Sequence, residues 1–294
     1  MIFSFLNKRF LFKLLSLFSV VRGYNIFFIV FAQLTSSIFI FSESKSYYSV
    51  LVDSNIWLII LSSICSISAG YIINNVYDSG KDLINRPLKT ILEKEISGKT
   101  KLNGYILLNI LTLFFAFLVS LKALLFFSLY ILGILFYSIR ISRYPFIGNF
   151  LSVALSIAPF FAITLYYKNF SSQILTHASF LFFVILIREL IKDLESLVGD
   201  LTMNYNTIPV KFGEKTTKAY ISFYIIITCS ISIWILINHS PSLVVYYYTL
   251  VIPFFIFFTY FLWEFNSKKH YILLHNSLKF LIIVGLFSII LQNL

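Results

Sequence analysis

Nine long apolar stretches constrain the fold of this chain more than any other feature. They cover residues 26–41, 56–76, 105–121, 123–139, 147–167, 178–190, 219–237, 243–263 and 271–291. A helix that crosses the hydrocarbon core of a bilayer needs about 20 apolar residues, and these stretches are near that length. The sequence therefore predicts an all-α polytopic membrane protein of about nine transmembrane helices in which residues 1–294 form a single integral-membrane domain. The count has a tolerance of about one, because only Lys122 separates the third stretch from the fourth.

Composition agrees with a membrane protein. Hydrophobic residues make up 59% of the chain, charged residues make up 12%, and the mean hydropathy of +0.89 lies outside the range of soluble domains. Residues 1–19 carry Lys8, Arg9 and Lys13 among Phe and Leu, and no small-residue cleavage site follows, so we expect an interfacial amphipathic helix there. The net charge of +11 does not indicate a nucleic-acid partner, because the basic residues are scattered among the loops.

The distribution of Lys and Arg between loops predicts the orientation. Nineteen lie in loops on the side of the N-terminus, and only Lys45, Lys122 and Lys168 lie in loops on the other side. Positive loops stay in the cytoplasm, which predicts a cytoplasmic N-terminus. We expect a multi-pass protein of the bacterial inner (cell) membrane.

A polar cluster stands at the end of the second apolar stretch, in G-Y-I-I-N-N-V-Y-D-S-G-K-D-L-I-N-R-P, residues 70–87. Asn74, Asp78 and Asp82 follow one another at intervals of four residues, and Asn75 precedes Asp82 by seven. On a continuous helix all four side chains would share one stripe. Pro87 is expected to end that helix.

A second cluster, at the end of the sixth stretch, consists of Asp193, Ser196 and Asp200, which repeat the offsets of Asn75, Asp78 and Asp82. Pro209 with Gly213 is expected to end its helix. Magnesium takes oxygen ligands and is commonly held by a few carboxylates together with substrate phosphates. A metal-bound diphosphate is a good leaving group, and an isoprenoid tail suits an apolar helix bundle. Both clusters lie on the predicted cytoplasmic side, so we expect ionisation of an allylic diphosphate at the membrane surface.

The two clusters carry a family resemblance. The pattern N-N-V-Y-D-S-G-K-D-x-x-N-R-P resembles the first aspartate-rich motif, N-D-x-x-D-x-x-x-D, of the UbiA superfamily of intramembrane prenyltransferases, and the second cluster resembles its D-x-x-D-x-x-x-D motif. The words R-E-L-I-K-D-L-E-S-L-V-G-D, T-I-P-V-K-F-G and V-R-G-Y-N are most similar to the geranylgeranylglycerol-phosphate geranylgeranyltransferase branch. The resemblance implies a helix bundle with a cytoplasm-facing active-site cavity, Mg²⁺ as cofactor, geranylgeranyl diphosphate as prenyl donor and geranylgeranylglyceryl phosphate as lipid acceptor.

The resemblance also implies roles for individual residues. Asp78, Asp82, Asp193 and Asp200 would be catalytic, and they would hold magnesium and diphosphate together with Asn74 and Asn75. The implied substrate-binding residues are Arg22, Asn25, Arg86, Tyr137, Arg140, Arg143 and Lys192. Positive-inside loops also explain Arg140 and Arg143, and an interfacial aromatic also explains Tyr137. No obligate protein partner is indicated.

The sequence departs from the family pattern at two positions. Asn75 and Ser196 stand where the family has Asp, so each motif lacks one negative charge, and Glu189 and Glu195 are the nearby carboxylates that would replace it. Three alternatives stay open: a quinone-ring acceptor, a catalytically degenerate family member, and a secondary transporter, whose acids would be expected near the bilayer midplane. The four histidines are expected at the membrane interface: His177, His239, His270 and His275.

Overall fold

The computed structural model describes residues 2–41, 47–238 and 244–290, and within these ranges every regular element is a helix. Nine helical segments in the described ranges are long and apolar enough to cross a membrane, which confirms the predicted fold class. They are α2 (Gly23–Ser36) continued by η1 (Ser37–Phe41), α4 (Ser54–Tyr77), α7 (Gly98–Val119), α8 (Leu121–Ile139), α9 (Ile147–Tyr167), α10 (Ser172–Glu195), α12 (Ile208–Asn238), α13 (Val244–Glu264) and α14 (Lys268–Ile290). The expected span ends at 243 and 291, together with Lys45 and His239, lie outside the described residues.

Helix α1 (Ile2–Val20) precedes the long apolar helices. Short helices lie between several of them: α3 (Tyr47–Val52), α5 (Ser79–Asn85), α6 (Pro87–Glu93), η2 (Ile141–Arg143) and α11 (Leu197–Thr202). The helix expected to run from the membrane to Pro87 already ends at Tyr77, where α4 stops. Pro87 does mark the end of the next helix, α5, and it begins α6 in the first turn, where a missing N–H costs nothing. The expectation for Pro209 was wrong, because Pro209 lies in the first turn of α12, and the backbone departs from helical angles at Gly213, with φ 83°.

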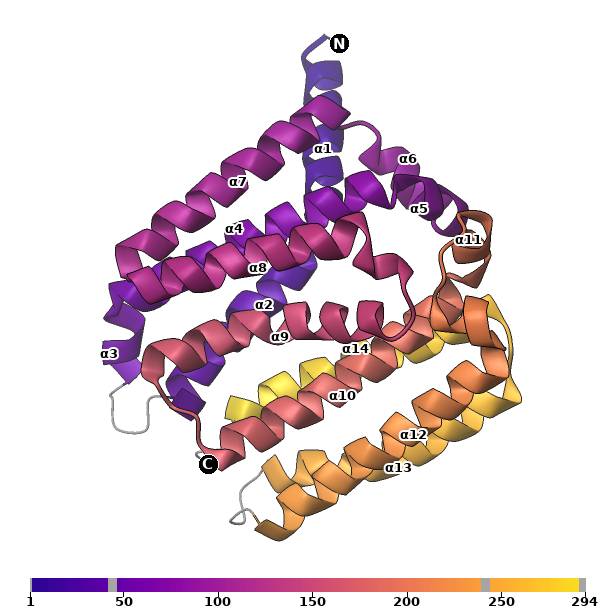
Figure 1. Ribbon diagram of the computed structural model, residues 1–294. Coiled ribbons are helices and arrows are strands. Elements are labelled where there is room, and N and C mark those ends of the chain that lie inside the picture. The colour runs from indigo at the N-terminus through magenta and orange to yellow at the C-terminus, as the bar shows by residue number, and fades with distance from the viewer. Residues whose placement is uncertain (1, 42–46, 239–243, 291–294) are drawn as a thin grey trace. The chain divides into compact units, whose positions relative to one another are not determined.

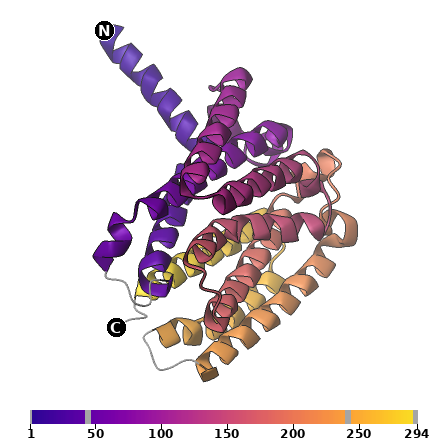
Figure 2. The same cartoon turned by 60° about the vertical axis from the view of Figure 1, so that its left-hand side comes forward.

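The chain divides into two compact units. The first comprises Met1–Phe31 and Asp53–Ile141, and the second comprises Ala32–Val52 and Ser142–Leu294. In the first unit, α4 packs against both α7 and α8, which also pack against each other (Figure 1). Buried serines of α4, including Ser62, Ser63 and Ser66, donate to backbone carbonyls one turn earlier, so that these small side chains let neighbouring helices approach closely. Helix α1 contacts α6 and α4 near its C-terminal end, and its N-terminal part extends away from them (Figure 2).

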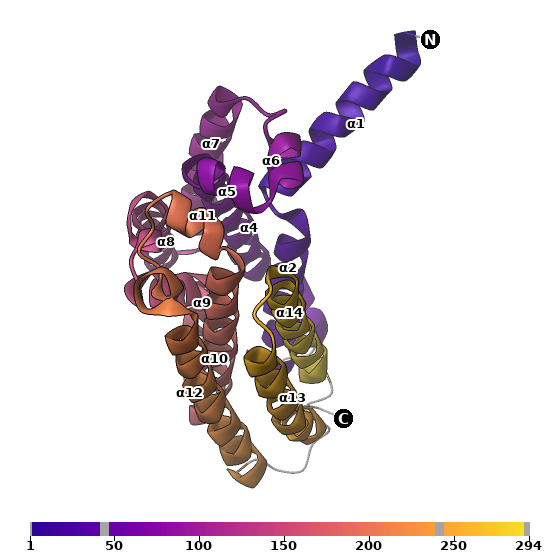
Figure 3. The same ribbon diagram turned by 90° about the vertical axis from the view of Figure 1, so that its right-hand side faces the viewer.

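The second unit is built around α10, which packs against α9, α12 and α14 (Figure 3). Helix α13 packs on α12 and α14. Its core contains fully buried aliphatic side chains from α10, such as Val184, Ile187 and Leu190, together with Val251 of α13 and Leu278 of α14. Continuous apolar packing of this kind fixes the position of α10 against its neighbours.

Two helices are more deeply buried than all other spans. In the most apolar part of α4, 67% of residues are buried, and for α10 the share is 56%, whereas it reaches at most 33% in any other span of the described chain. α4 is the central helix of the first unit and α10 that of the second. Each leads directly into one of the two polar clusters, so each cluster has a rigid base.

Candidate active site

The first cluster lies across a helix junction and not on one continuous helix. Helix α4 ends at Tyr77, Asp78 has φ −91° and ψ 4°, and α5 begins at Ser79. The backbone hydrogen bonds nevertheless keep their four-residue spacing, because the Asp78 N–H donates to the carbonyl of Asn74 and the Asp82 N–H to that of Asp78, both at 2.8 Å. The prediction of a single straight stripe is therefore corrected to a bend centred on Asp78, which changes the direction of the chain between Asn74 and Asp82.

The second cluster has the same backbone arrangement. Helix α10 ends at Glu195, Ser196 has φ −99° and ψ 8°, and α11 begins at Leu197. The Ser196 N–H donates to the Lys192 carbonyl and the Asp200 N–H to the Ser196 carbonyl, both at 3.0 Å. The repeated offsets in the sequence thus correspond to a repeated helix–bend–helix motif, once in each unit.

Asn75 is engaged at both ends of its side-chain amide. Its Nδ2 donates to Glu93 Oε2 at 2.7 Å, and its Oδ1 accepts from Lys101 Nζ at 2.7 Å. The same Glu93 carboxylate accepts from Ser19 Oγ at 2.8 Å and pairs with Lys89 Nζ at 3.4 Å. Asn75 therefore forms part of a buried polar network, and sequence reasoning missed Glu93, since nothing in the local pattern distinguishes it from its exposed neighbour Glu95.

Asn74 offers an oxygen that suits a cation. Its Oδ1 is buried and has no hydrogen-bond partner among the described residues, although buried polar atoms normally have one. Asp78 and Asp82 are half-buried one and two turns further along. An orphaned amide oxygen followed at intervals of four residues by two carboxylates is the oxygen-only donor chemistry that Mg²⁺ takes, so the residues of the first motif fit this metal.

Arg22 and Asn25 both lie against Tyr71, which the sequence reasoning did not single out. The Arg22 guanidinium stacks over the Tyr71 ring, 5.0 Å from its centroid, and Asn25 Nδ2 donates to the Tyr71 hydroxyl at 3.1 Å. Tyr71 precedes Asn75 by one helical turn on α4. The connection between α1 and α2 is thereby held against α4 one turn before Asn75, and the substrate-binding role of Arg22 and Asn25 stays a prediction.

Lys89 adds a cation to this side of the first unit. Burial, followed by the positive charge of Arg22, lowers the pKa of Lys89, and Arg86 acts in the same direction, while Glu93 and Asp82 oppose the shift. The electrostatic neighbours of Lys89 thus include the predicted residues Arg22, Asp82 and Arg86. Arg22, Arg86 and Lys89 are cations that can pair with the oxygens of a diphosphate, and the neighbouring carboxylates can bind its metal ions. The signal for Lys89 in the sequence was its place three residues after Arg86.

The residues predicted after α8 divide between the two units. Tyr137 is half-buried and Arg140 is exposed at the C-cap of α8, both in the first unit. Arg143 belongs to the second unit, where its guanidinium lies over the Tyr205 ring, 4.9 Å from the centroid, and its carbonyl accepts from the N–H of Asn206. Arg143 is therefore held against the segment that follows the second motif.

Both carboxylates of the second motif are buried and held by side-chain donors. Asp193 Oδ2 accepts from Asn149 Nδ2 of α9 at 2.7 Å. Asp200 Oδ2 accepts from Ser196 Oγ and from Thr207 Oγ1, each at 3.2 Å. Ser196, which stands where the family has Asp, therefore binds the next carboxylate of its own motif.

Glu189 and Glu195, the proposed replacements for the missing charges, are both buried and bonded to neighbours. Glu189 pairs with Lys192 and with Arg188, and it accepts from Ser152 Oγ at 3.1 Å. Lys192, predicted to contact diphosphate, therefore has its ammonium group on Glu189.

Glu195 pairs with a histidine that was expected at the interface. Its Oε2 lies 2.8 Å from His275 Nδ1 of α14, and His275 is only 4% exposed. The prediction of an interfacial His275 was wrong, because α14 packs along α10 and brings the ring against the end of that helix. A tertiary contact between residues 80 positions apart has no signal in the local sequence.

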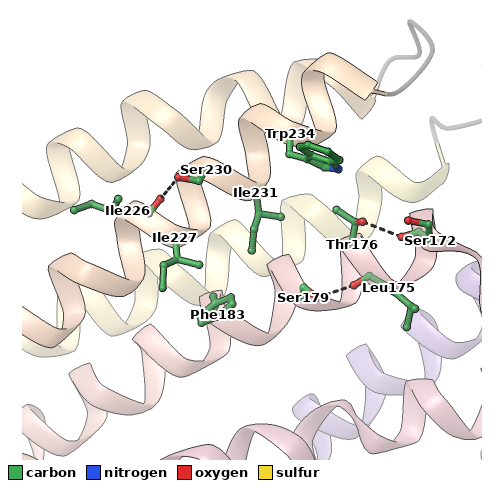
Figure 4. A pocket seen from close by; sticks show the side chains of 10 residues that line it. All are labelled: Ser172, Leu175, Thr176, Ser179, Phe183, Ile226, Ile227, Ser230, Ile231 and Trp234. Carbon is green, nitrogen blue, oxygen red and sulfur yellow. Dashed lines mark hydrogen bonds between the residues drawn. The ribbon is translucent and has the colours of Figure 1, made fainter.

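A separate groove lies near the opposite end of α10 from the second motif. Figure 4 shows its lining, formed by α10 and α12, with a volume of about 570 Å³: Ser172, Leu175, Thr176, Ser179, Phe183, Ile226, Ile227, Ser230, Ile231 and Trp234. The hydroxyls of Thr176, Ser179 and Ser230 donate to carbonyls of their own helices, which leaves an apolar surface. The groove contains none of the predicted site residues.

Comparisons with known proteins agree with this description. Residues 18–281 match the model of the UbiA prenyltransferase family. Among curated proteins, digeranylgeranylglyceryl phosphate synthase of Methanobrevibacter smithii is 31% identical over 200 residues, which are 64% of this chain and 69% of that protein. The enzyme of the same name from Saccharolobus solfataricus is 30% identical over 149 residues, 50% of this chain and 52% of that protein. The matched segments thus span about half to two thirds of the length of these relatives.

Solved structures share the fold over nearly the whole chain. A UbiA homolog from Archaeoglobus fulgidus bound to GPP and Mg²⁺ has a TM-score of 0.70 at 16% identity, covering 94% of this chain and 99% of that one. A structure described as digeranylgeranylglyceryl phosphate synthase in membranes has a TM-score of 0.69 at 20% identity, covering 95% and 98%. At these identities the likeness concerns the fold.

The chain belongs to the UbiA prenyltransferase family, as its two aspartate-rich motifs predicted. It is a multi-pass membrane prenyltransferase, similar in sequence to digeranylgeranylglyceryl phosphate synthases. Family membership favours the enzyme over the transporter alternative.

Proposed function

We propose that this protein transfers a geranylgeranyl group from geranylgeranyl diphosphate to geranylgeranylglyceryl phosphate in a magnesium-dependent reaction. The observation that carries the proposal is the pair of matching helix bends at the ends of α4 and α10, the most buried helices of the two units, with two aspartates at or near each bend. The names of the curated relatives support this donor and acceptor.

In the proposed site, Asn74, Asp78 and Asp82 supply metal ligands from the first motif, and Asp193 and Asp200 supply them from the second. Bound Mg²⁺ would neutralise the charge that develops on the departing diphosphate. Asn75 is not included among these ligands, because both ends of its amide are already bonded.

The chain's own cations complete the site. Arg22, Arg86 and Lys89 would bind diphosphate oxygens and stabilise the leaving group as the bond between donor carbon 1 and oxygen breaks. An oxygen of the acceptor hydroxyl then bonds to this carbon, its proton passes to solvent, and diphosphate leaves. Asp78 and Asp82 are half-buried, so their carboxylates are partly shielded from water and attract a cation more strongly.

The direct test is an assay of the purified, lipid-reconstituted protein with radiolabelled geranylgeranyl diphosphate and Mg²⁺. Geranylgeranylglyceryl phosphate, dihydroxynaphthoate and hydroxybenzoate are offered in parallel. We expect a labelled lipid product with the glyceryl phosphate alone, lost on chelation. A prenylated aromatic product instead would overturn the proposed acceptor, and binding of the donor with no transfer to any acceptor would indicate a degenerate enzyme.

We also propose that the N-terminus and both motifs face the cytoplasm of a bacterial cell. In a background without Cys65 and Cys229, Glu95→Cys between α6 and α7 should react with a membrane-impermeant maleimide only after permeabilisation. The matched variant Phe170→Cys, between α9 and α10, should react in intact cells. The reverse pattern would invert the proposed orientation.

A further inference from the structure

Glu93 is a buried carboxylate outside both motifs that nevertheless binds the first of them. It is 2% exposed and receives hydrogen bonds or ion pairs from three elements: Ser19 of α1, Asn75 of α4 and Lys89 of its own helix α6. An ionised carboxylate is buried this deeply only when its charge is compensated. The contact with Asn75 therefore holds a negative charge 2.7 Å from the position where the family has an aspartate.

The chemistry at position 75 demands an amide. Asn75 donates to the Glu93 carboxylate and accepts from the Lys101 ammonium, so each end of its side chain faces a partner of the matching kind. An aspartate at position 75 would place two carboxylates in hydrogen-bond contact with no donor between them. Like charges at this separation cannot both stay ionised in a buried setting.

The second unit contains the same contact with its two partners exchanged. At the position corresponding to Asn75, Asp193 provides the carboxylate, and the neighbouring helix α9 provides the amide of Asn149, again at 2.7 Å. In the first unit the motif provides the amide and the neighbouring helix α6 provides the carboxylate. Both units thus join their motif to an adjacent helix by one amide–carboxylate hydrogen bond.

We propose that Glu93 and Asn75 are a transposed pair, in which Glu93 carries the negative charge that position 75 lacks and acts as a positioning residue of the first motif. The functional part rests on the proposed magnesium-dependent reaction. Glu93 holds the ammonium of Lys89, whose other electrostatic neighbours include Asp82. Without the Glu93 charge, Lys89 would turn toward Asp82 and compete with Mg²⁺ for that ligand.

The test is a set of three variants, Asn75→Asp, Glu93→Gln and the double variant, with Glu95→Gln as the control. Glu95 is the exposed carboxylate two residues from Glu93. The double variant gives the first unit the arrangement of the second, with the carboxylate in the motif and the amide on the neighbouring helix. The new carboxylate at position 75 would then accept from the new amide at position 93 and from Lys101. The oxygen of that amide would accept from Ser19 and Lys89.

Two readouts separate the roles of the pair. The first is Tm in lipid without Mg²⁺, where we expect Asn75→Asp to lower Tm by about 5 °C and the double variant to regain most of the loss. The second is the Mg²⁺ concentration that gives half of the Tm increase seen with geranylgeranyl diphosphate. We expect Glu93→Gln to raise it by about tenfold, and the double variant and Glu95→Gln to stay within about twofold of the wild type.

A double variant no better than the worse single variant would overturn the transposed pair. Recovery of Tm with an unchanged Mg²⁺ midpoint in Glu93→Gln would reduce Glu93 to a purely structural contact and overturn its positioning role. The first readout needs no catalysis, so a wild-type protein that transfers no prenyl group would contradict the proposed function while the Tm series still decides on the pair.

Discussion

The ends of α4 and α10 share a backbone geometry but differ in where their charges come from. Asp78 and Ser196 occupy the same bend, with φ and ψ within about 10° of each other, yet one carries a carboxylate and the other a hydroxyl. The first end obtains a further carboxylate from α6, whereas the second keeps its carboxylates within the motif and draws amide and hydroxyl donors from elsewhere. The comparison teaches that the backbone motif is repeated strictly, while its charges can be redistributed among adjacent helices.

The repetition has a physical basis in the two central helices. A helix that continues its four-residue hydrogen bonds across a bend satisfies its terminal carbonyls without added partners. Because each bend stands at the end of a deeply buried helix, it also places side chains at a fixed depth. A negative charge does not have to come from the motif itself, since a carboxylate on a neighbouring helix can lie equally close, as Glu93 of α6 does at Asn75.

Removal of an aspartate from each motif should have the largest effect and tests whether the two ends are functionally equivalent. We expect Asp78→Ala and Asp193→Ala each to lower kcat/KM by about 10³-fold or more, because each removes a proposed metal ligand. The measurement is the reconstituted transfer assay, with Ser79→Ala, an exposed neighbour of Asp78, as the control. Full activity in both aspartate variants would refute the metal-site assignment, and loss in only one would show that the two ends are unequal.

Ser196→Asp should have an intermediate effect, which is measured as a change in Tm. The substitution makes the end of α10 resemble the end of α4, where Asp78 occupies the bend. The new carboxylate would lie near Asp200, whose Oδ2 is now 3.2 Å from the serine hydroxyl. We expect a lower Tm without Mg²⁺ and recovery when Mg²⁺ and geranylgeranyl diphosphate are added, because a bound cation relieves the repulsion. Ser196→Ala, which removes the hydroxyl and its hydrogen bond to the Asp200 carboxylate without adding a charge, serves as the control. A Tm of Ser196→Asp that does not respond to the metal would contradict a cation site at this motif.

The smallest expected effect is a change of folding stability with pH, which comes from Lys89 in the first unit. Burial and Arg22 lower the pKa of Lys89 below its ordinary value of 10.5, so the folded protein binds this proton less readily than the unfolded chain. The protonated ammonium therefore lowers the free energy of unfolding, and this loss is complete below the folded pKa. It disappears as the pH rises from the folded pKa to the unfolded pKa, so stability should increase with pH in that range. Lys89 is one third exposed, so we expect a change in Tm of about 2 °C or less.

The measurement is the difference in Tm between the wild type and Lys89→Met from about pH 8 to pH 10.5. The wild type should gain stability relative to the variant as the pH rises. A difference that is constant with pH would show that the ammonium of Lys89 titrates as it does in the unfolded chain.

The sequence by itself determined the elements that depend on neighbouring residues. Hydropathy along the chain marked every helix of the described residues that is long and apolar enough to cross a membrane, and Pro87 marked the boundary between α5 and α6. The equal offsets of the two clusters predicted a repeated structure, which the matching bends at Asp78 and Ser196 confirm. Local patterns suffice for these features because hydrogen bonding within a helix and burial in a bilayer act on consecutive residues.

Only the tertiary structure decided which side chains compensate the charges of the motifs. Glu93 reaches Asn75 across 18 residues, Asn149 reaches Asp193 across 44, and His275 reaches Glu195 across 80. Sequence reasoning assigned the missing charge to Glu189 or Glu195, which are near in sequence but are bonded to other groups. A carboxylate buried in an apolar bundle must find its partner wherever helix packing brings one, and that pairing is a property of the packed helices and not of the sequence pattern around either residue.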